Sequence, residues 1–326
     1  MYKEIYPNIF HLEVPLRNNP LKALNCYIIK GEQSLVIDTG FDTQENRDLL
    51  RKAFEDLDIN PKSTRLFLTH LHSDHTGLAH YLDELGLEVY IGEVDGEFLR
   101  AMPDRNSHHW QGIIKLAELQ GLEEDQLILD DHPGFKFRPK ALPQLNYTSE
   151  AQSFQVAGYN FSVLDLPGHT PGLQALYEAD QGLLFSGDHL LEDITPNITF
   201  WGEKYGDSLG IYLDNLDKLR TMNISKIFSS HRRLPQDHLK RIDELAYHHE
   251  ERLKEVLAIL EANGPSTVRE VTRSMNWDIR AKDWDDFPSS QKWFAAGEAH
   301  AHLVHLREKN QIKEEQHKGL LYYSLI

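Results

Sequence analysis

THLHSDHTG, residues 69–77, is the stretch of this sequence that decides how the chain is interpreted. It follows an apolar run that predicts a strand and precedes residues with helical spacing. Alternate side chains of an extended segment point the same way, so His70 and His72 can converge on one ion. Asp74 and His75 lie in the following turn, where they can serve a neighbouring position. Three imidazoles and a carboxylate suit a borderline metal such as zinc; the alternative is a polar loop that happens to be rich in histidine.

Three further candidate ligands lie at the ends of later apolar runs. His169 follows residues 163–168, Asp188 follows residues 183–187, and His231 comes after a short apolar run of its own. Loops at strand ends are a common place for functional residues, because the scaffold beneath them is rigid. Each residue alone would be interpreted as a solvated loop residue. Together they can supply a third ligand for each of two metals and one carboxylate that bridges them.

This pattern resembles the metallo-β-lactamase-fold hydrolase superfamily. The segment HLHSDH matches its HxHxDH motif, and the three later candidates match its remaining ligand positions in order. The resemblance covers roughly residues 1–235 and implies an α/β fold, the αββα sandwich, with the site on one edge. It also implies two metal positions and their ligands: His70, His72 and His169 for one, Asp74, His75 and His231 for the other, and Asp188 as the bridge.

The resemblance implies a hydrolase that needs no serine or cysteine nucleophile. Two divalent metals, with zinc expected and iron or manganese as alternatives, would share a bridging hydroxide that attacks a small ester, thioester or lactone. Asp74 is a candidate proton shuttle as well as a ligand. Asp38 matches the family's early aspartate and is expected to accept a hydrogen bond from a ligating histidine; the alternative is a turn-capping carboxylate.

Five other residues are weaker candidates for the surroundings of the site. His108 could line the mouth of the pocket, and His189 adjoins a candidate ligand. Trp201, Tyr205 and Tyr212 follow the Asp188 loop and could form a wall for the substrate, although core packing explains Tyr212 equally well. A histidine triplet on a later helical pattern imitates a metal site, but we expect packing or solvent exposure there: His300, His302 and His305.

The chain divides near residue 235. Residues 1–235 hold the strand-rich part, with a helical insertion at about 94–150. Residues 236–326 change to three helical patterns followed by a closing hairpin, which predicts a winged-helix domain. This second part is similar to the domain appended to one bacterial and mitochondrial branch of the superfamily, which includes the LACTB2-like proteins. We expect it to pack on the first domain, shape the pocket or mediate a homodimer.

Composition limits the partners of the protein. The 326 residues carry 34 basic and 51 acidic side chains, a net charge of −17, which argues against binding through phosphate neutralisation. Cys26 is the single cysteine, so an intramolecular disulfide framework is excluded. No apolar run is long enough to span a membrane, and the N-terminus carries no apolar signal segment. We therefore expect a cytoplasmic protein with a small-molecule substrate.

Two alternative functions stay open at this point. One is a single-strand endoribonuclease of the LACTB2-like type, for which the local basic residues are the only support: Lys136, Arg138, Lys140, Arg232 and Arg233. The other is a non-enzymatic regulator whose C-terminal unit binds DNA. The helical pattern at residues 291–309 lacks the basic stripe that such a recognition helix needs.

Overall fold

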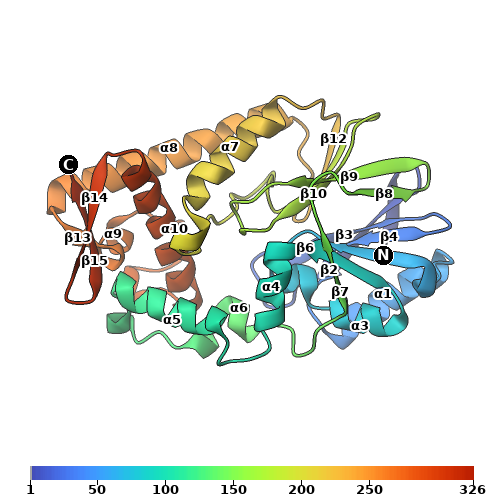
Figure 1. The fold of residues 1–326 in the computed structure, drawn as a ribbon, viewed down its shortest axis with the longest axis horizontal. Coiled ribbons are helices and arrows are strands. Elements are labelled where there is room, and N and C mark those ends of the chain that lie inside the picture. Colours follow the sequence, from blue (N-terminus) through green and yellow to red (C-terminus); the bar gives the residue numbers. More distant parts are fainter. Residues whose placement is uncertain (1) are drawn as a thin grey trace.

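The computed structural model describes residues 2–326 and places two β-sheets face to face between layers of helices (Figure 1). The seven-stranded sheet has the order β1 (Tyr2–Tyr6), β2 (Ile9–Pro15), β3 (Ala23–Ile29), β4 (Ser34–Ile37), β5 (Thr64–Leu68), β6 (Glu88–Gly92) and β7 (Leu145–Thr148). The five-stranded sheet has the order β12 (Lys226–Ser229), β11 (Leu183–Gly187), β10 (Gln174–Glu178), β9 (Tyr159–Asp165) and β8 (Ser153–Val156).

The central strands of the first sheet bury both of their faces. In β3, Leu24, Cys26 and Ile28 face the helices outside the sheet, whereas Tyr27 and Ile29 face the second sheet. This is the period-two alternation of an extended chain. Because both faces are covered, the strand is an almost continuous apolar run rather than a half-polar one.

Helices cover the outer faces of both sheets. On the seven-stranded sheet lie α1 (Gln44–Asp56) and α3 (Ala79–Leu85), packed through Leu50 and Leu82. On the five-stranded sheet lies α7 (Ser208–Arg220). The predicted α/β sandwich is therefore confirmed.

Helices occupy the first part of the segment predicted as a helical insertion, about 94–150, whereas a strand occupies its last part. Helices α4 (Glu93–Ala101), α5 (His108–Gln120) and α6 (Pro133–Lys136) lie within it. Residues 145–148, however, form β7, which pairs in parallel with β6 and extends the first sheet. This strand has a weak sequence signal, because it has only four residues and follows Pro143. It also lies at a sheet edge, where polar residues such as Asn146 are tolerated.

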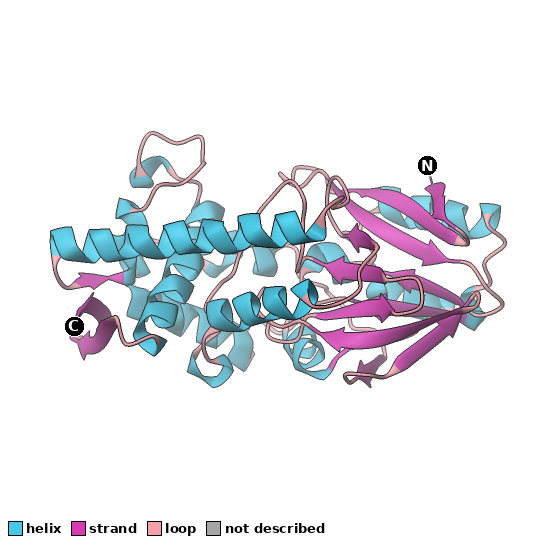
Figure 2. Ribbon diagram, turned by 90° about the horizontal axis from the view of Figure 1, so that it is seen from above, coloured by secondary structure: helices cyan, strands magenta, loops and turns pink. Residues whose placement is uncertain are grey.

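The C-terminal segment builds a small unit of its own. It consists of α8 (His238–Asn263), β13 (Ser266–Thr267), α9 (Val268–Ser274), α10 (Ser289–Glu308), β14 (Ile312–His317) and β15 (Leu320–Leu325). The predicted helices and closing hairpin are thus present, and β13 adds a third strand beside β15. Figure 2 shows these helices at one end of the molecule and the two sheets at the other. In the part of the chain that is described, no helix is long and apolar enough to cross a membrane.

Helix α10 packs against the first part of the chain as well as its own unit. Its Ala296 shares an apolar cluster with Ala117 of α5, and α10 also contacts α7. The helix buries His300, His302 and His305, as expected from packing. These rings hydrogen-bond to protein groups: His300 with Gln120 and Tyr323, His302 with His249, and His305 with Asp207.

A buried ion-pair network ties the insertion to the C-terminal unit. The Asp125 side chain, 2% exposed, accepts hydrogen bonds from Arg269 Nε at 2.6 Å, Trp284 Nε1 at 2.7 Å and Lys292 Nζ at 3.1 Å. Burial alone would raise the pKa of this carboxyl, but the three donors lower it below its usual value. The carboxylate therefore stabilises the contact between the two segments.

Replacing Asp125 with alanine should lower the free energy of unfolding by about 3 kcal/mol, because the buried Lys292 loses its counter-charge and the buried Arg269 keeps only the exposed Glu124. The urea-denaturation midpoint at neutral pH measures this loss. Asp130→Ala is the matched control, because the Asp130–Arg105 pair lies in the same insertion but is exposed. It should cost less than about 1 kcal/mol. Equal losses in the two variants would contradict a stabilising role for the Asp125 network.

Candidate metal centre

The candidate ligands gather at one edge of the sandwich because several strands end there. His70 and His72 follow β5, and Asp188 and His231 follow the parallel pair β11 and β12. His169 lies in the loop between β9 and β10. Each ligand is thus carried on a short loop anchored by a buried strand, which holds its side chain in a defined position.

The first group consists of three histidines. His72 Nδ1 lies 3.0 Å from His70 Nε2 and 3.0 Å from His169 Nε2. Zinc–nitrogen bonds of about 2.0–2.1 Å in tetrahedral geometry place neighbouring nitrogens roughly 3.3 Å apart. The three imidazoles therefore have the spacing of a divalent metal site.

The second group lies beside the first and shares a carboxylate with it. Asp74 Oδ2 lies 3.5 Å from His231 Nε2, and Asp74 Oδ1 lies 3.9 Å from His75 Nε2. Asp188 Oδ1 lies 3.6 Å from His75 Nε2 and 3.4 Å from His231 Nε2. Its other oxygen, Oδ2, lies 3.7 Å from His169 Nε2. One carboxylate therefore faces both groups, one oxygen toward each.

Unpartnered polar atoms show that these residues fit bound cations. His75 Nε2, His231 Nε2 and Asp188 Oδ1 are buried, and none of them has a hydrogen-bond partner within residues 2–326. Leaving buried polar atoms unpaired is costly, so such atoms are rare in proteins. Three of them around one point, two imidazole nitrogens and a carboxylate oxygen, form the donor set of a divalent metal.

Asp38 orients His75 of the second group by a hydrogen bond to the ring nitrogen that faces away from the group. Its Oδ2 lies 2.8 Å from His75 Nδ1 and 2.8 Å from Thr69 Oγ1, and its Oδ1 accepts from the Thr69 backbone N–H. With the proton of His75 on Nδ1, the lone pair of Nε2 points to the group. The residue has a φ of +57°, a strained conformation that is typical of functional sites.

Three of the other four histidines, His70, His169 and His231, are oriented in the same way by their outer nitrogens. Thr69 Oγ1, which donates to Asp38, lies 3.0 Å from His70 Nδ1 and can accept its proton. The carbonyl oxygens of Asn197 and Ala23 lie 2.8 Å from His169 Nδ1 and 2.9 Å from His231 Nδ1. These acceptors place the protons on the outer nitrogens and leave the facing nitrogens free to bind.

The electrostatics favour the metal-binding protonation states of His70 and Asp188. Burial, together with the neighbouring His75, holds the pKa of His70 well below its usual value. Burial alone would raise the pKa of Asp188, but His231 and His75 hold it well below the usual range of a carboxyl. Neutral imidazole and ionised carboxylate are the forms that coordinate a metal. At His75, burial lowers the pKa but the carboxylates of Asp38, Asp188 and Asp74 outweigh it and raise the pKa, so a cation there competes with a proton.

An aromatic wall flanks the first group. The Trp201 indole stacks on His72, with ring centroids 6.3 Å apart, and its Nε1 donates to the His169 carbonyl at 3.2 Å. Phe98 of α4 contacts both Trp201 and Tyr205, at centroid distances of 5.4 and 5.3 Å. Trp201 thus contacts the first group directly, whereas Tyr205 is linked to it only through Phe98, a residue that the sequence reasoning missed.

The other three surrounding candidates are not part of this wall. His108 is exposed at the start of α5, and its neighbour His109 contacts Phe98 instead. Tyr212 is fully buried in the core between α7 and the second sheet, where its hydroxyl donates to the His189 carbonyl. The His189 ring packs on Tyr212, and burial lowers its pKa to about 3. Asp188 lies in a turn directly after β11, and the ring of the next residue, His189, faces Tyr212.

Asp95 is a second residue that sequence reasoning missed. This buried carboxylate accepts hydrogen bonds from Leu71 N at 2.9 Å, Thr170 Oγ1 at 2.6 Å and Gly172 N at 2.7 Å. It therefore ties the loop of His70 and His72 to the loop of His169. Burial raises its pKa to about 6 although the three donors lower it. Its position shortly after β6 was an available signal, because the other site residues also follow strands.

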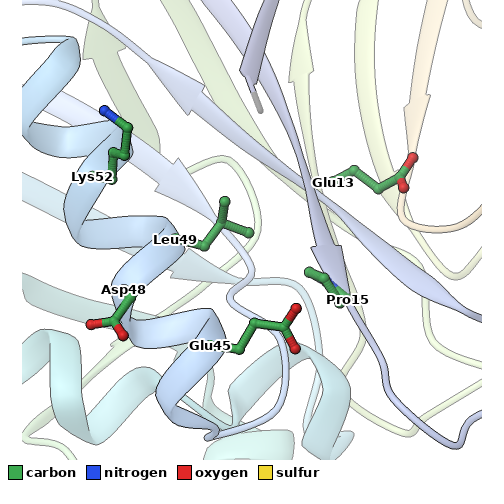
Figure 3. Close-up of a pocket in the computed structure, with 6 residues that line it drawn as sticks. All are labelled: Glu13, Pro15, Glu45, Asp48, Leu49 and Lys52. Carbon is green, nitrogen blue, oxygen red and sulfur yellow. The ribbon is translucent and has the colours of Figure 1, made fainter.

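A surface pocket elsewhere on the molecule lacks these features. It has a volume of about 630 Å³ and lies between β2 and α1 (Figure 3). Its lining is mostly charged and includes Glu13, Glu45, Asp48 and Lys52. Glu45 is already paired with Arg17 at 2.6 Å. None of the seven clustered ligands lines it, so the histidine cluster is the candidate functional site.

Comparison with known proteins identifies the family of the chain. The family model described as the metallo-beta-lactamase superfamily matches residues 21–231, which is more than half of the chain and includes all seven clustered residues. The chain therefore belongs to the metallo-β-lactamase superfamily.

Individual relatives are similar over different lengths. A hydroxyacylglutathione hydrolase, GloC, of Haemophilus influenzae is 28% identical over 52% of this chain and 67% of its own length. An atrochrysone carboxyl ACP thioesterase, AacuM, of Aspergillus aculeatus is 27% identical over 69% of this chain but only 56% of its own length. A solved metallo-beta-lactamase family protein of Thermus thermophilus is 26% identical, with a TM-score of 0.79 over 99% of this chain and all of that one.

Replacing Asp38 with asparagine should weaken zinc binding by about 10- to 100-fold, because the amide cannot replace the carboxylate acceptor for both His75 and Thr69. Competition with a chromophoric chelator measures the affinity. Asp58→Asn is a matched control: Asp58 also has a positive φ, +54°, but it is exposed. Wild-type affinity in Asp38→Asn would show that the carboxylate does not orient the group.

Proposed function

We propose that this protein is a dinuclear metal-dependent hydrolase of small thioesters or esters, with lactones as a related substrate class. The observation that carries the proposal is the position of Asp188, whose two oxygens face different groups of ligands. The names of the relatives, a hydroxyacylglutathione hydrolase and an ACP thioesterase, favour a thioester. Zinc is the expected metal, with iron or manganese as alternatives.

The residues of the chain have distinct roles in this proposal. Divalent ions held here would lower the pKa of a water molecule and polarise the carbonyl oxygen of a substrate. The Asp74 side chain is 13% exposed, whereas those of His75 and His231 are fully buried. Asp74 can therefore pass a proton between the site and solvent. Cys26 is no competing nucleophile, because burial raises the pKa of its thiol.

The aromatic wall supports a small substrate with an apolar portion. Trp201 presents a half-buried ring to the first group, and the half-buried rings of Phe98 and Tyr205 continue this aromatic surface. Such rings can cover an acyl group and exclude water from the bond that is cleaved.

We also propose that residues 236–326 form a winged-helix domain. The support is the order α8, β13, α9, α10, β14 and β15, with β15 between the other two strands. Helix α10 occupies the place of a recognition helix, but it packs between α7, α8 and α9. The domain therefore serves packing rather than nucleic-acid binding.

The endoribonuclease alternative has weaker support. The guanidinium of Arg233 lies 2.5 Å from Asp193, and that of Arg232 donates to the Pro20 carbonyl. These contacts compete with binding to a phosphate backbone, and the net charge of −17 opposes it as well.

Asp188→Asn should reduce hydrolysis of acyl-thioesters by about a thousandfold, since removing the shared charge forfeits several kcal/mol of transition-state stabilisation. Release of free thiol from S-acyl glutathione and short acyl-CoA substrates measures the rate. Metal analysis of the replete wild type should give about two equivalents.

Asp193→Asn is the control for this experiment, because Asp193 pairs with Arg233 in the same loop region but contributes to none of the metal groups found within residues 2–326. It should keep wild-type activity. Less than one equivalent of metal in replete wild-type protein would contradict the dinuclear proposal, and unchanged activity of Asp188→Asn would contradict the role of the shared carboxylate.

A further inference from the structure

We propose that the C-terminal unit completes the metal centre, with Glu298 of α10 as a positioning residue for His169. The proposal rests on the metal centre of the proposed function and deepens it. Glu298 lies 129 positions after His169 in the sequence and acts on it through Asn197. The C-terminal unit is then a working part of the site rather than a separate appendage.

The connection runs through two hydrogen bonds. His169 Nδ1 donates to the Asn197 carbonyl at 2.8 Å, which directs its Nε2 toward the first group. The side chain of the same residue, Asn197 Nδ2, lies 3.1 Å from Glu298 Oε2 and 3.4 Å from the carbonyl of Phe294. Both acceptors belong to α10, so the helix holds the residue that orients the histidine.

Glu298 is itself held in place by the core of the C-terminal unit. Its carboxylate lies 3.6 Å from Arg252 Nε of α8, and the two side chains are only 15% and 10% exposed. Arg252 donates to Glu255 at 2.5 Å and to the Asn276 carbonyl at 2.7 Å. Its guanidinium also lies over the Trp277 ring. The acceptor for Asn197 is therefore a fixed, buried group and not a mobile surface carboxylate.

The rest of the Asn197 loop is pressed against the same helix. The Phe200 backbone N–H donates to the Gly297 carbonyl at 3.2 Å, and the Phe200 side chain packs with Ala301 and Val304. A Cβ at Gly297 would overlap Thr199 Oγ1, so the helix approaches the loop as closely as glycine allows.

The next residue of this loop, Trp201, touches the first group directly. It stacks on His72 and donates to the His169 carbonyl. One loop, residues 197–201, therefore carries three contacts to the first group on one side and its contacts with α10 on the other.

A physical consequence follows for metal binding. The acceptor of the outer N–H sets the ring orientation of a ligating histidine, and loss of such acceptors typically costs about 10–100-fold in metal affinity. If Glu298 no longer anchors Asn197, the carbonyl can shift and His169 can rotate away from His70 and His72. The first group would then lose one of its three nitrogens.

The test compares zinc affinities of full-length variants by competition with a chromophoric chelator. Glu298→Ala should weaken binding about tenfold or more. Glu298→Gln keeps an acceptor for Asn197 and should remain within about threefold of the wild type. Asn197→Ala should resemble Glu298→Ala, and the double variant should be no weaker than either single variant, because both remove the same link.

A spectroscopic measurement separates this role from a purely structural one. In the cobalt-loaded protein, Glu298→Ala should change the visible absorption of the metal, whereas Glu298→Gln should restore it. Asp125→Ala is the matched control, because it loosens the contact of α10 with the insertion but does not touch Asn197. It should lower stability and leave zinc affinity within about twofold of wild type.

Three results would overturn the proposal. These are wild-type zinc affinity in Glu298→Ala, an equal loss in Asp125→Ala, or additive losses in the double variant. If Glu298→Ala does not fold, Asn197→Ala and Glu298→Gln decide the question in its place. If the wild type itself binds no zinc, the proposed function fails; if the wild type binds zinc and the Glu298 variants bind it equally well, only the present inference fails.

Discussion

The structure depends on a set of buried ligand atoms that converge without a protein partner for each. Three buried atoms face one another and have no hydrogen-bond partner within residues 2–326: His75 Nε2, His231 Nε2 and Asp188 Oδ1. A protein tolerates such a cost where a cation offsets it. Metal binding also explains the hydrogen-bond acceptors on the far side of the histidines, such as Asp38 and the carbonyl of Asn197. Each acceptor keeps the proton of its histidine on the outer nitrogen, so that the inner nitrogen can bind the metal.

The two sheets bring the ligand residues, which are far apart in the sequence, to one edge of the molecule. The ligand loops follow strands that end at one edge, and the strands are buried on both faces by apolar side chains. The loops are still short polar segments that need their own anchors. Asp95 supplies one of them by joining the loop after β5 to the loop that carries His169. The scaffold therefore sets the approximate positions, and buried hydrogen bonds set the orientations.

The C-terminal unit has a direct connection to this arrangement. A helix with little outward-facing polar surface, α10, is covered on several sides and touches the loop that orients His169. Its buried polar groups, such as Glu298 and His305, face other polar groups rather than solvent. Buried and fully paired polar contacts favour one packing arrangement over others, which is what a site assembled from distant segments requires.

The sequence by itself determined the main strands and helices and the seven residues that gather at the edge, because these signals are local: alternation, helical spacing, and polar residues at strand ends. The fold class followed from the resemblance of these motifs to the superfamily. Only the tertiary structure decided what depends on chain direction and distant packing. It placed Tyr212 in the core and His108 in solvent, added β7 to the sheet edge, and revealed Asp95. The physical reason is that a turn can send neighbouring side chains to opposite sides, and a buried carboxylate acquires its role from partners far away in the sequence.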